Sequence, residues 1–363
     1  MRIPQTLKPG GGAFRTISCI AVGFLLVAHK LRFPAGIILK GKLRSMYQNW
    51  TPEMFKNYIT SFGRKLPHDQ ICTPRLPDSF EPLVTEGIPT EHLLDETAIR
   101  DFYRKGYLEP FSVFSAEEMD EFSDLLLARM KEPSDIYGFV CERDRHIDTP
   151  EMMKMIANPA ISDRLAQLLG PKLEAWRSQI FFKPPGKNPV GWHQASTFMF
   201  EESFSEPAVI PPDLSELFQL TVWIAVDPAT RANGCLKMLE GTMQEGIRWM
   251  KLGGKIGFHA VNYEPDYDVD ESKINYVEME RGQVLIFSER TIHGSDPNTT
   301  DSNRLAFNFR AVPSHVQVYW PGKKIHRSGQ MEQSFDLTKW RSVQIRGNDN
   351  DGPNHTAPWQ DYV

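Results

Sequence analysis

The sequence predicts an α+β domain whose core is a β-sandwich or jelly roll. Hydrophobic residues make up 40% of the 363 residues and aromatic residues 11%, which is enough for a substantial core. Before Gly170, apolar residues recur at helical spacing. After it, short β-branched and aromatic runs are broken by Gly, Pro and Asn. Helices followed by many strands are typical of this class.

Residues 1–45 form a basic and apolar N-terminal segment. Residues 1–52 contain eight Lys or Arg and no Asp or Glu, and an apolar run extends from Ile17 to Ala28. A membrane-spanning helix needs ~20 apolar residues, so the run is short for one. A signal peptide, an organelle transit peptide and a membrane anchor are alternatives. We favour a basic anchor or weak transmembrane segment, with membrane contact through residues 13–40 and a cytoplasmic catalytic domain. An ordinary helix packed on the core explains the run equally well.

Residues 46–97 predict a Pro-rich connecting region, and the ordered catalytic structure is expected to begin near Glu96. Three helices should follow. The first has a capping box at Ser115 and Glu118, and the second has Thr149 as N-cap before Pro150. The third ends at Gly170. We interpret the apolar stripes of these helices as faces packed on a sheet.

Six strands are expected after the last helix, over residues 174–183, 219–227, 235–240, 284–288, 305–312 and 316–320. Residues 200–217 and 252–273 predict long loops of the kind that form lids or binding loops. Residues 346–363 are polar and interrupted by Pro, which predicts a frayed C-terminal tail.

Charge and cysteine content exclude some function classes. The net charge of −5 and the acidic isoelectric point lack the excess of positive charge that is typical of nucleic-acid-binding proteins. The four cysteines are scattered without zinc-type spacing, which indicates reduced, mostly buried thiols in a reducing compartment.

Two histidines stand out by their context. His193 lies in Trp192-His193-Gln194-Ala195, and His293 follows a hundred residues later in Thr291-Ile292-His293-Gly294-Ser295. Period-2 alternation puts positions 193 and 195 on the same face of a strand. Mononuclear non-haem iron sites usually have His-x-Asp there and a second His further along, which together form a facial triad. Here a methyl group replaces the carboxylate.

These motifs resemble the phytanoyl-CoA dioxygenase family of iron(II)/2-oxoglutarate enzymes. The resemblance also rests on Arg304, eleven residues after His293, and on the run from Leu220 to Asp227. It covers roughly residues 98–345 and implies a double-stranded β-helix (jelly roll or cupin-like) with flanking N-terminal helices. The Ala195 variant, with Arg310-Ala311-Val312-Pro313 downstream, is similar to the family's syringomycin-type aliphatic halogenases.

The resemblance implies a set of site residues. His193 and His293 would bind iron(II), and Arg304 would bind the distal carboxylate of 2-oxoglutarate through its planar fork. Trp223 is implied beside the cosubstrate, and Gln179 is a further candidate contact to it. Near the halide, the resemblance implies Thr221, the gap at Ala195 and, more remotely, Arg310. Core packing explains Trp223 equally well.

The expected activity is chlorination of an unactivated aliphatic C–H bond, with oxygen as oxidant and decarboxylation of 2-oxoglutarate to succinate. Chloride would fill the position left by Ala195. The substrate would be a small molecule, free or tethered to a carrier, in secondary or lipid metabolism. If water or a displaced carboxylate such as Glu201 or Glu202 fills the gap instead, the enzyme is a hydroxylase. A non-catalytic 2-oxoglutarate-binding protein is the alternative from another class.

Overall fold

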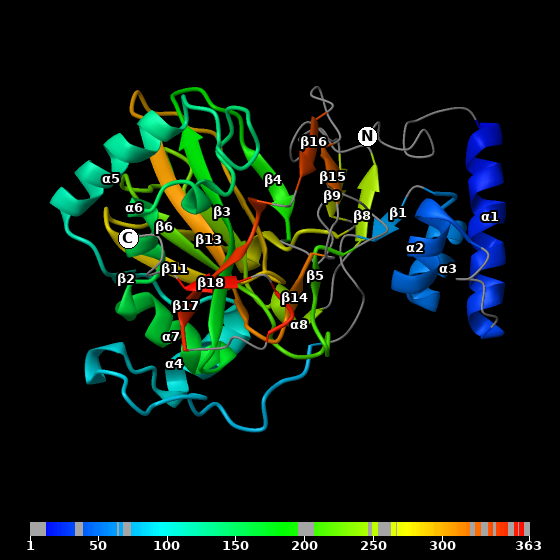
Figure 1. Cartoon of the computed structure of the whole chain (residues 1–363), viewed down its shortest axis with the longest axis horizontal. Helices are drawn as coiled ribbons and strands as arrows, with labels where there is room; N and C mark the ends of the chain where they lie inside the picture. The colour runs from blue at the N-terminus through cyan, green and yellow to red at the C-terminus, as the bar shows by residue number, and fades with distance from the viewer. Residues whose placement is uncertain are drawn as a thin grey trace.

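The computed structural model describes residues 12–32, 39–63, 65–67, 74–194, 207–245, 249–252, 263–265, 267–319, 324–327, 333–336, 339–347, 352–354 and 356–358. A small group of N-terminal helices lies at one end of the molecule, and a larger domain of sheets and helices forms the rest (Figure 1).

The N-terminal helices are α1 (Gly12–Lys30), α2 (Gly41–Asn49) and α3 (Pro52–Thr60), and they share an apolar cluster. Trp50 and Phe55 lie at its centre, with ring centroids 5.4 Å apart. Thr51 caps α3, because its Oγ1 accepts a hydrogen bond from the N–H of Met54 and Pro52 occupies the first position. The region expected as a connection from residue 46 therefore begins with the end of α2 and the whole of α3.

A short three-stranded sheet joins this unit to the rest of the chain. Strand β1 (Lys65–Pro67) pairs with β8 (Trp249–Leu252), and β8 pairs with β9 (Tyr263–Pro265). These strands bring residues that are almost two hundred positions apart in the sequence next to one another.

Two antiparallel sheets form the body of the larger domain. The larger sheet has the order β18-β17-β3-β13-β6-β11-β2, and only β17 and β18 run parallel. Its strands are β2 (Phe111–Ser112), β3 (Leu173–Lys183), β6 (Leu220–Ala225), β11 (Gln283–Ser288), β13 (Arg304–Pro313), β17 (Ser342–Arg346) and β18 (Thr356–Pro358). The smaller sheet has the order β10-β7-β12-β4, formed by β4 (Val190–His193), β7 (Leu236–Leu239), β10 (Ile274–Val277) and β12 (Ile292–Ser295).

Helices pack on one face of the larger sheet. They are α4 (Glu96–Lys105), α5 (Ala116–Arg129), α6 (Glu151–Ile156) and α7 (Pro159–Leu169). Alternation along β13 directs Phe307 and Phe309 toward them, and the rings of Phe122 and Phe307 meet edge to face at 5.5 Å. The capping box of Ser115 and Glu118 begins α5 as expected. Helix α6 has Pro150 rather than Thr149 as its N-cap.

The other face of the larger sheet packs against the smaller sheet. Trp223, Leu285, Phe287 and Ala306 from the larger sheet share an apolar cluster with Met238 of β7. Two facing antiparallel sheets with helices outside confirm the predicted α+β class and its double-stranded β-helix core. The even-numbered side chains of β13 point into the space between the two sheets.

The six strand ranges expected from the sequence leave out several strands, although His193 itself was expected on a strand. Three strands of the smaller sheet, β4, β10 and β12, have only four residues each and contain polar residues or Gly. In the expected tail, β18 pairs with β17, and the Asn354 side-chain amide donates to Glu174 Oε2 at 2.9 Å. That stretch is therefore not entirely a frayed end. The remaining elements are β5 (Val209–Ile210) paired with β14 (Gln317–Val318), β15 (Lys324–Arg327) paired with β16 (Gln333–Asp336), α8 (Thr242–Glu245), η2 (Thr90–His92), η3 (Arg145–Ile147) and η4 (Glu271–Lys273).

Two further expectations concern cysteines and membranes. Cys19, Cys141 and Cys235 are free and buried, and Cys72 lies outside the described residues. Within the described ranges, no helix combines the length and apolar character that crossing a bilayer requires.

Candidate functional site

His193 and His293 lie next to each other on neighbouring strands of the smaller sheet. They are direct partners in the antiparallel register of β4 and β12, and their ring centroids lie 4.2 Å apart. Directly opposed residues of an antiparallel pair project their side chains to the same face. A pair of residues a hundred positions apart in the sequence therefore places two imidazoles side by side.

Backbone carbonyls orient both rings in the same way. His193 Nδ1 lies 2.8 Å from the carbonyl oxygen of Gly191, and His293 Nδ1 lies 2.9 Å from that of Thr291. A carbonyl oxygen only accepts, so each Nδ1 carries the proton and each Nε2 keeps its lone pair. This is the ring orientation and protonation that metal-binding histidines require.

The burial of His293 favours a neutral imidazole there, whereas His193 is half-buried. Burial, followed by the neighbouring His193, holds the pKa of His293 well below its usual value. Neutral imidazole is the form that binds a metal, so the residues fit an iron(II) ion. In the described part of the chain, no group of three or more His, Cys, Asp or Glu side chains converges on a common point. Ala195 lies outside the described residues, as do Glu201 and Glu202.

The larger sheet supplies the wall opposite the imidazoles. The ring of Phe287 meets that of His293 edge-on, with centroids 4.8 Å apart. Phe287, Thr221 and Arg310 are consecutive cross-strand partners on β11, β6 and β13. Thr221 Oγ1 is buried and has no hydrogen-bond partner among the described residues. The fold thus brings Thr221 and Arg310, two residues expected in the site, into direct contact range.

A second row of cross-strand partners runs parallel to the first. Trp223 and Gln179 flank Asn308, the former on β6 and the latter on β3. Trp223 is 2% exposed, whereas Gln179 is half-buried. Asn308 was not expected from the sequence, because its amide becomes part of the site only through this register.

Arg304 lies at the end of the same sheet face. It is 4% exposed, and its guanidinium carbon is 5.5 Å from the centre of the Trp223 ring. Its Nε has no hydrogen-bond partner in the described chain, and burial lowers the pKa of this guanidinium to about 10. A buried planar cation with an unsatisfied donor fits a carboxylate. Arg304 therefore suits one carboxylate of a small dicarboxylate such as 2-oxoglutarate.

Lys183 is a second buried cation that the sequence reasoning missed. It is 3% exposed, and its Nζ donates to Ser295 Oγ at 2.7 Å and to the carbonyl of Asp296. Burial, and then the charge of Arg304, lower its pKa to about 8. In the sequence, Lys183 directly follows the aromatic residues Phe181 and Phe182, and this position was the one indication that the lysine is buried.

A buried polar network borders the row of Arg310. Arg143 and Arg177 both donate to the hydroxyl of Tyr319, the first at 3.0 Å. Asp144 is fully buried beside them, and the positive charges of Arg177 and Arg143 keep its pKa below the usual value against the opposing effect of burial. This network fixes Arg177, the cross-strand partner of Arg310 on β3.

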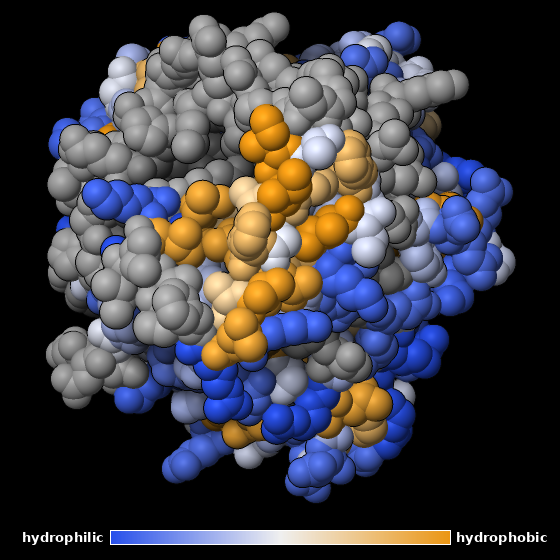
Figure 2. All heavy atoms as spheres, turned by 90° about the vertical axis from the view of Figure 1, so that its right-hand side faces the viewer, coloured by the Kyte–Doolittle hydropathy of each residue, from blue (hydrophilic) through white to orange (hydrophobic). Residues whose placement is uncertain are grey.

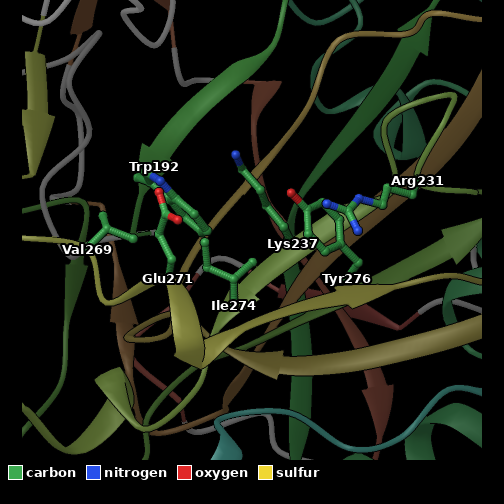
Figure 3. Close-up of a pocket in the computed structure, with 7 residues that line it drawn as sticks. All are labelled: Trp192, Arg231, Lys237, Val269, Glu271, Ile274 and Tyr276. Atoms are coloured by element: carbon green, nitrogen blue, oxygen red, sulfur yellow. The ribbon is translucent and has the colours of Figure 1, made fainter.

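A separate pocket of about 530 Å³ lies on the other face of the smaller sheet (Figure 3). Trp192 faces it because residues 192 and 193 alternate on β4. Lys237 Nζ lies 4.5 Å from the centre of the Trp192 ring and 2.7 Å from Asp296 Oδ1. The pocket is lined by Trp192, Arg231, Lys237, Val269, Glu271, Ile274 and Tyr276. These contacts support the strand of His193 from behind rather than adding to the site.

Comparison with known proteins shows which family the chain resembles. The family model described as "Phytanoyl-CoA dioxygenase (PhyH)" matches residues 102–306. A "Probable alpha-ketoglutarate-dependent hypophosphite dioxygenase" of Stutzerimonas stutzeri is 27% identical over 246 residues, which cover 61% of this chain and 79% of that protein. A "Probable phytanoyl-CoA dioxygenase" of Caenorhabditis elegans is 28% identical over 205 residues, covering 54% of this chain and 61% of that protein.

Solved structures show the same fold. The structure of CytC3 with Fe(II) and alpha-ketoglutarate is similar with a TM-score of 0.58 and 28% identity, over 73% of this chain and 93% of that chain. EctD from S. alaskensis has a TM-score of 0.52 and 17% identity, over 80% of this chain and 99% of that chain, which is a likeness of fold alone.

Proposed function

The chain belongs to the phytanoyl-CoA dioxygenase family of iron(II)/2-oxoglutarate-dependent oxygenases, and from that premise we propose that it halogenates an unactivated aliphatic C–H bond. The proposed reaction is a chlorination coupled to decarboxylation of 2-oxoglutarate to succinate. The substrate is a small molecule, free or tethered to a carrier. When bound, iron(II) with 2-oxoglutarate and oxygen supplies the oxidant that removes the hydrogen atom from the substrate.

The observation that carries the proposal is alanine at position 195, two residues after His193. A methyl group cannot bind a metal, and a cationic centre held by two imidazoles attracts an anion to the open position.

The chain's own residues have distinct tasks in this proposal. His193 and His293 hold the metal through Nε2, because their Nδ1 protons are engaged by backbone carbonyls. Arg304 binds the distal carboxylate of 2-oxoglutarate with its guanidinium, whose buried Nε has no partner among the described residues. The apolar wall that contains Phe287 excludes water from the imidazoles.

Thr221 is the residue that we assign to the anion. Its buried hydroxyl has no acceptor among the described residues, so a halide near His293 would give it one. Arg310, its cross-strand partner, adds a positive charge on the same face. Both features favour an anion on this side of the imidazole pair.

Hydroxylation is the second candidate. The relatives named above are called dioxygenases, and Glu201 or Glu202, six and seven residues beyond Ala195, would restore a carboxylate ligand if the chain folds back. A binding protein without turnover is the third, and the same experiment separates the three.

The test is anaerobic addition of iron(II) and 2-oxoglutarate, with and without chloride, followed by the charge-transfer absorption of the bound cosubstrate. The wild type and Ala195→Gly should both show a band that shifts with chloride. In Ala195→Asp the band should persist without a chloride response, because a carboxylate then occupies the position.

Each result decides between the candidates. A wild-type band that ignores chloride, with succinate formed on admission of oxygen, contradicts halogenation and establishes an oxygenating enzyme. No band, with 2-oxoglutarate still bound by calorimetry, assigns the non-catalytic protein. A chlorinated product from Ala195→Asp would show that the halide does not use this position.

A further inference from the structure

Helix α1 carries an exposed apolar stripe. Five large side chains recur at intervals of three and four residues along it and its end, with exposed fractions between 54% and 73%. They are Ile17, Ile20, Phe24, Val27 and Leu31. Figure 2 shows apolar residues gathered in a continuous band down this face of the molecule. Contiguous exposed apolar bands of this kind mark interaction surfaces.

The stripe is distinct from the face that holds α1 in the fold. Cys19, Val22 and Leu25 are buried against α2 and α3. Only one face of α1 packs on the neighbouring helices, and the other face exposes large apolar side chains to solvent. Elsewhere in the described chain, exposed large apolar residues such as Leu83 and Val140 occur singly.

The charge around the stripe identifies the partner. Residues 1–52 contain eight Lys or Arg and no acidic residue, in a chain whose overall net charge is −5. Lys30 and Arg32 are exposed at the end of α1, next to Val27 and Leu31. An exposed apolar helix face with cations at its end, in a segment without acidic residues, is complementary to the surface of an anionic bilayer, where side chains enter the interface and cations meet lipid head groups.

We propose that α1 is a membrane-surface helix that lies flat on an anionic bilayer and inserts the stripe of Ile17, Ile20, Phe24, Val27 and Leu31 into the interface. A second copy of the chain fits less well. Two such segments would bring cations together with no acidic residue to pair with them, whereas helix pairs of this kind use opposite charges beside the apolar seam. The three helices lie before the first residue that the family model matches, so this surface is separate from the proposed chemistry.

The experiment is flotation of the full-length protein with vesicles of phosphatidylcholine alone and of phosphatidylcholine mixed with phosphatidylserine in equal amounts. The wild type should float with the mixed vesicles and lose binding as salt is raised. The double substitution Ile20→Glu and Phe24→Glu should reduce binding by a factor of about ten or more, because it places charges in the apolar stripe. Lys30→Glu with Arg32→Glu should reduce it several-fold on the mixed vesicles.

Leu83→Glu is the matched control, because Leu83 is 65% exposed and lies outside the stripe. It should bind as the wild type does. Circular dichroism and thermal unfolding check that α1 stays folded in every variant. If the wild type fails to float with the mixed vesicles, or if the double variant floats equally well, the proposal is overturned. If the wild type does not float but is a dimer that the double variant splits, the stripe binds a second copy. No metal or 2-oxoglutarate is needed, so the result is independent of the catalytic proposal.

Discussion

Lys183 and Arg304 are direct partners across β3 and β13, so two cationic side chains with 3% and 4% exposure stand side by side at one end of the barrel interior. Lys183 is held by Ser295 and the carbonyl of Asp296, whereas the Nε of Arg304 has no partner in the described chain. Burying two like charges together is costly unless an anion completes the site. The pair therefore indicates where the carboxylate of a cosubstrate belongs.

Replacing Arg304 should weaken 2-oxoglutarate binding strongly. Truncating one partner of a buried charge pair costs about 2–5 kcal/mol, so Arg304→Gln should raise the Kd by roughly thirtyfold or more. Calorimetry on the metal-loaded protein without oxygen measures it. Arg100→Gln, an exposed arginine paired with Glu96 on α4, should leave the Kd unchanged. An unchanged Kd in Arg304→Gln would place the carboxylate elsewhere.

Lys183 should make cosubstrate binding depend on pH. Its pKa is lowered to about 8 by burial and by Arg304, so its positive charge is present below that pH and is lost above it. The affinity for the dicarboxylate should therefore fall as pH rises through about 8, with the decline absent in Lys183→Met. Titrations across this range measure the effect. If the affinities of the two proteins depend on pH in the same way, Lys183 contacts only Ser295 and Asp296 and does not contribute to cosubstrate binding.

Much of the site could be predicted from the sequence because its residues sit in motifs along single strands. Alternation marked His193 as a strand residue, and the family resemblance implied His293, Thr221 and Trp223 in the same site. Register could not be predicted. Asn308 lies between Trp223 and Gln179, and Lys183 beside Arg304, only because β13 pairs with both β3 and β6 in one alignment. A slip of one residue would turn these side chains to the helices.

The fold was predictable where elements are long and less so where they are short. The capping box and apolar stripe gave α5, and the β-branched runs gave β6, β11 and β13. Strands β4 and β12 were not outlined because four residues with Gly and His carry almost no periodicity. Their pairing with β7 and with each other, rather than local preference, makes them strands.

Acid should destabilise the fold through His146. This side chain is fully buried, its Nδ1 contacts Ser178 Oγ at 2.7 Å, and burial lowers its pKa from 6.5 to about 4. Between those two values the unfolded chain binds a proton that the folded chain does not, so stability falls as pH decreases from 6.5 to about 4. The loss is at most about 3 kcal/mol. His146→Asn, which cannot take up the proton, should show a shallower decline in denaturant unfolding of the metal-free protein. Equal slopes would exclude His146 as the cause.

Gly106 and Thr291 allow a test of how the fold positions His293. Gly106 has a φ of +95°, and a Cβ there would lie 2.1 Å from Thr291 Oγ1, which itself donates to the Gly106 carbonyl. The Thr291 carbonyl is the acceptor for His293 Nδ1, so moving Thr291 disturbs the imidazole. Gly106→Ala should therefore lower the free energy of unfolding by roughly 3 kcal/mol or more, from backbone strain and overpacking together. It should also weaken iron binding by about tenfold, as expected for loss of a contact that orients a ligand.

Gly87→Ala separates strain from contact, because Gly87 also has a positive φ, +73°, but a Cβ there would have nothing within 4 Å. This variant should lose only about 1 kcal/mol, the strain alone, and bind iron normally. Denaturant unfolding and metal titration of both variants give the comparison. Equal losses of stability would mean that Thr291 moves aside without cost. Unchanged iron affinity in Gly106→Ala would mean that the Thr291 carbonyl does not control the orientation of His293.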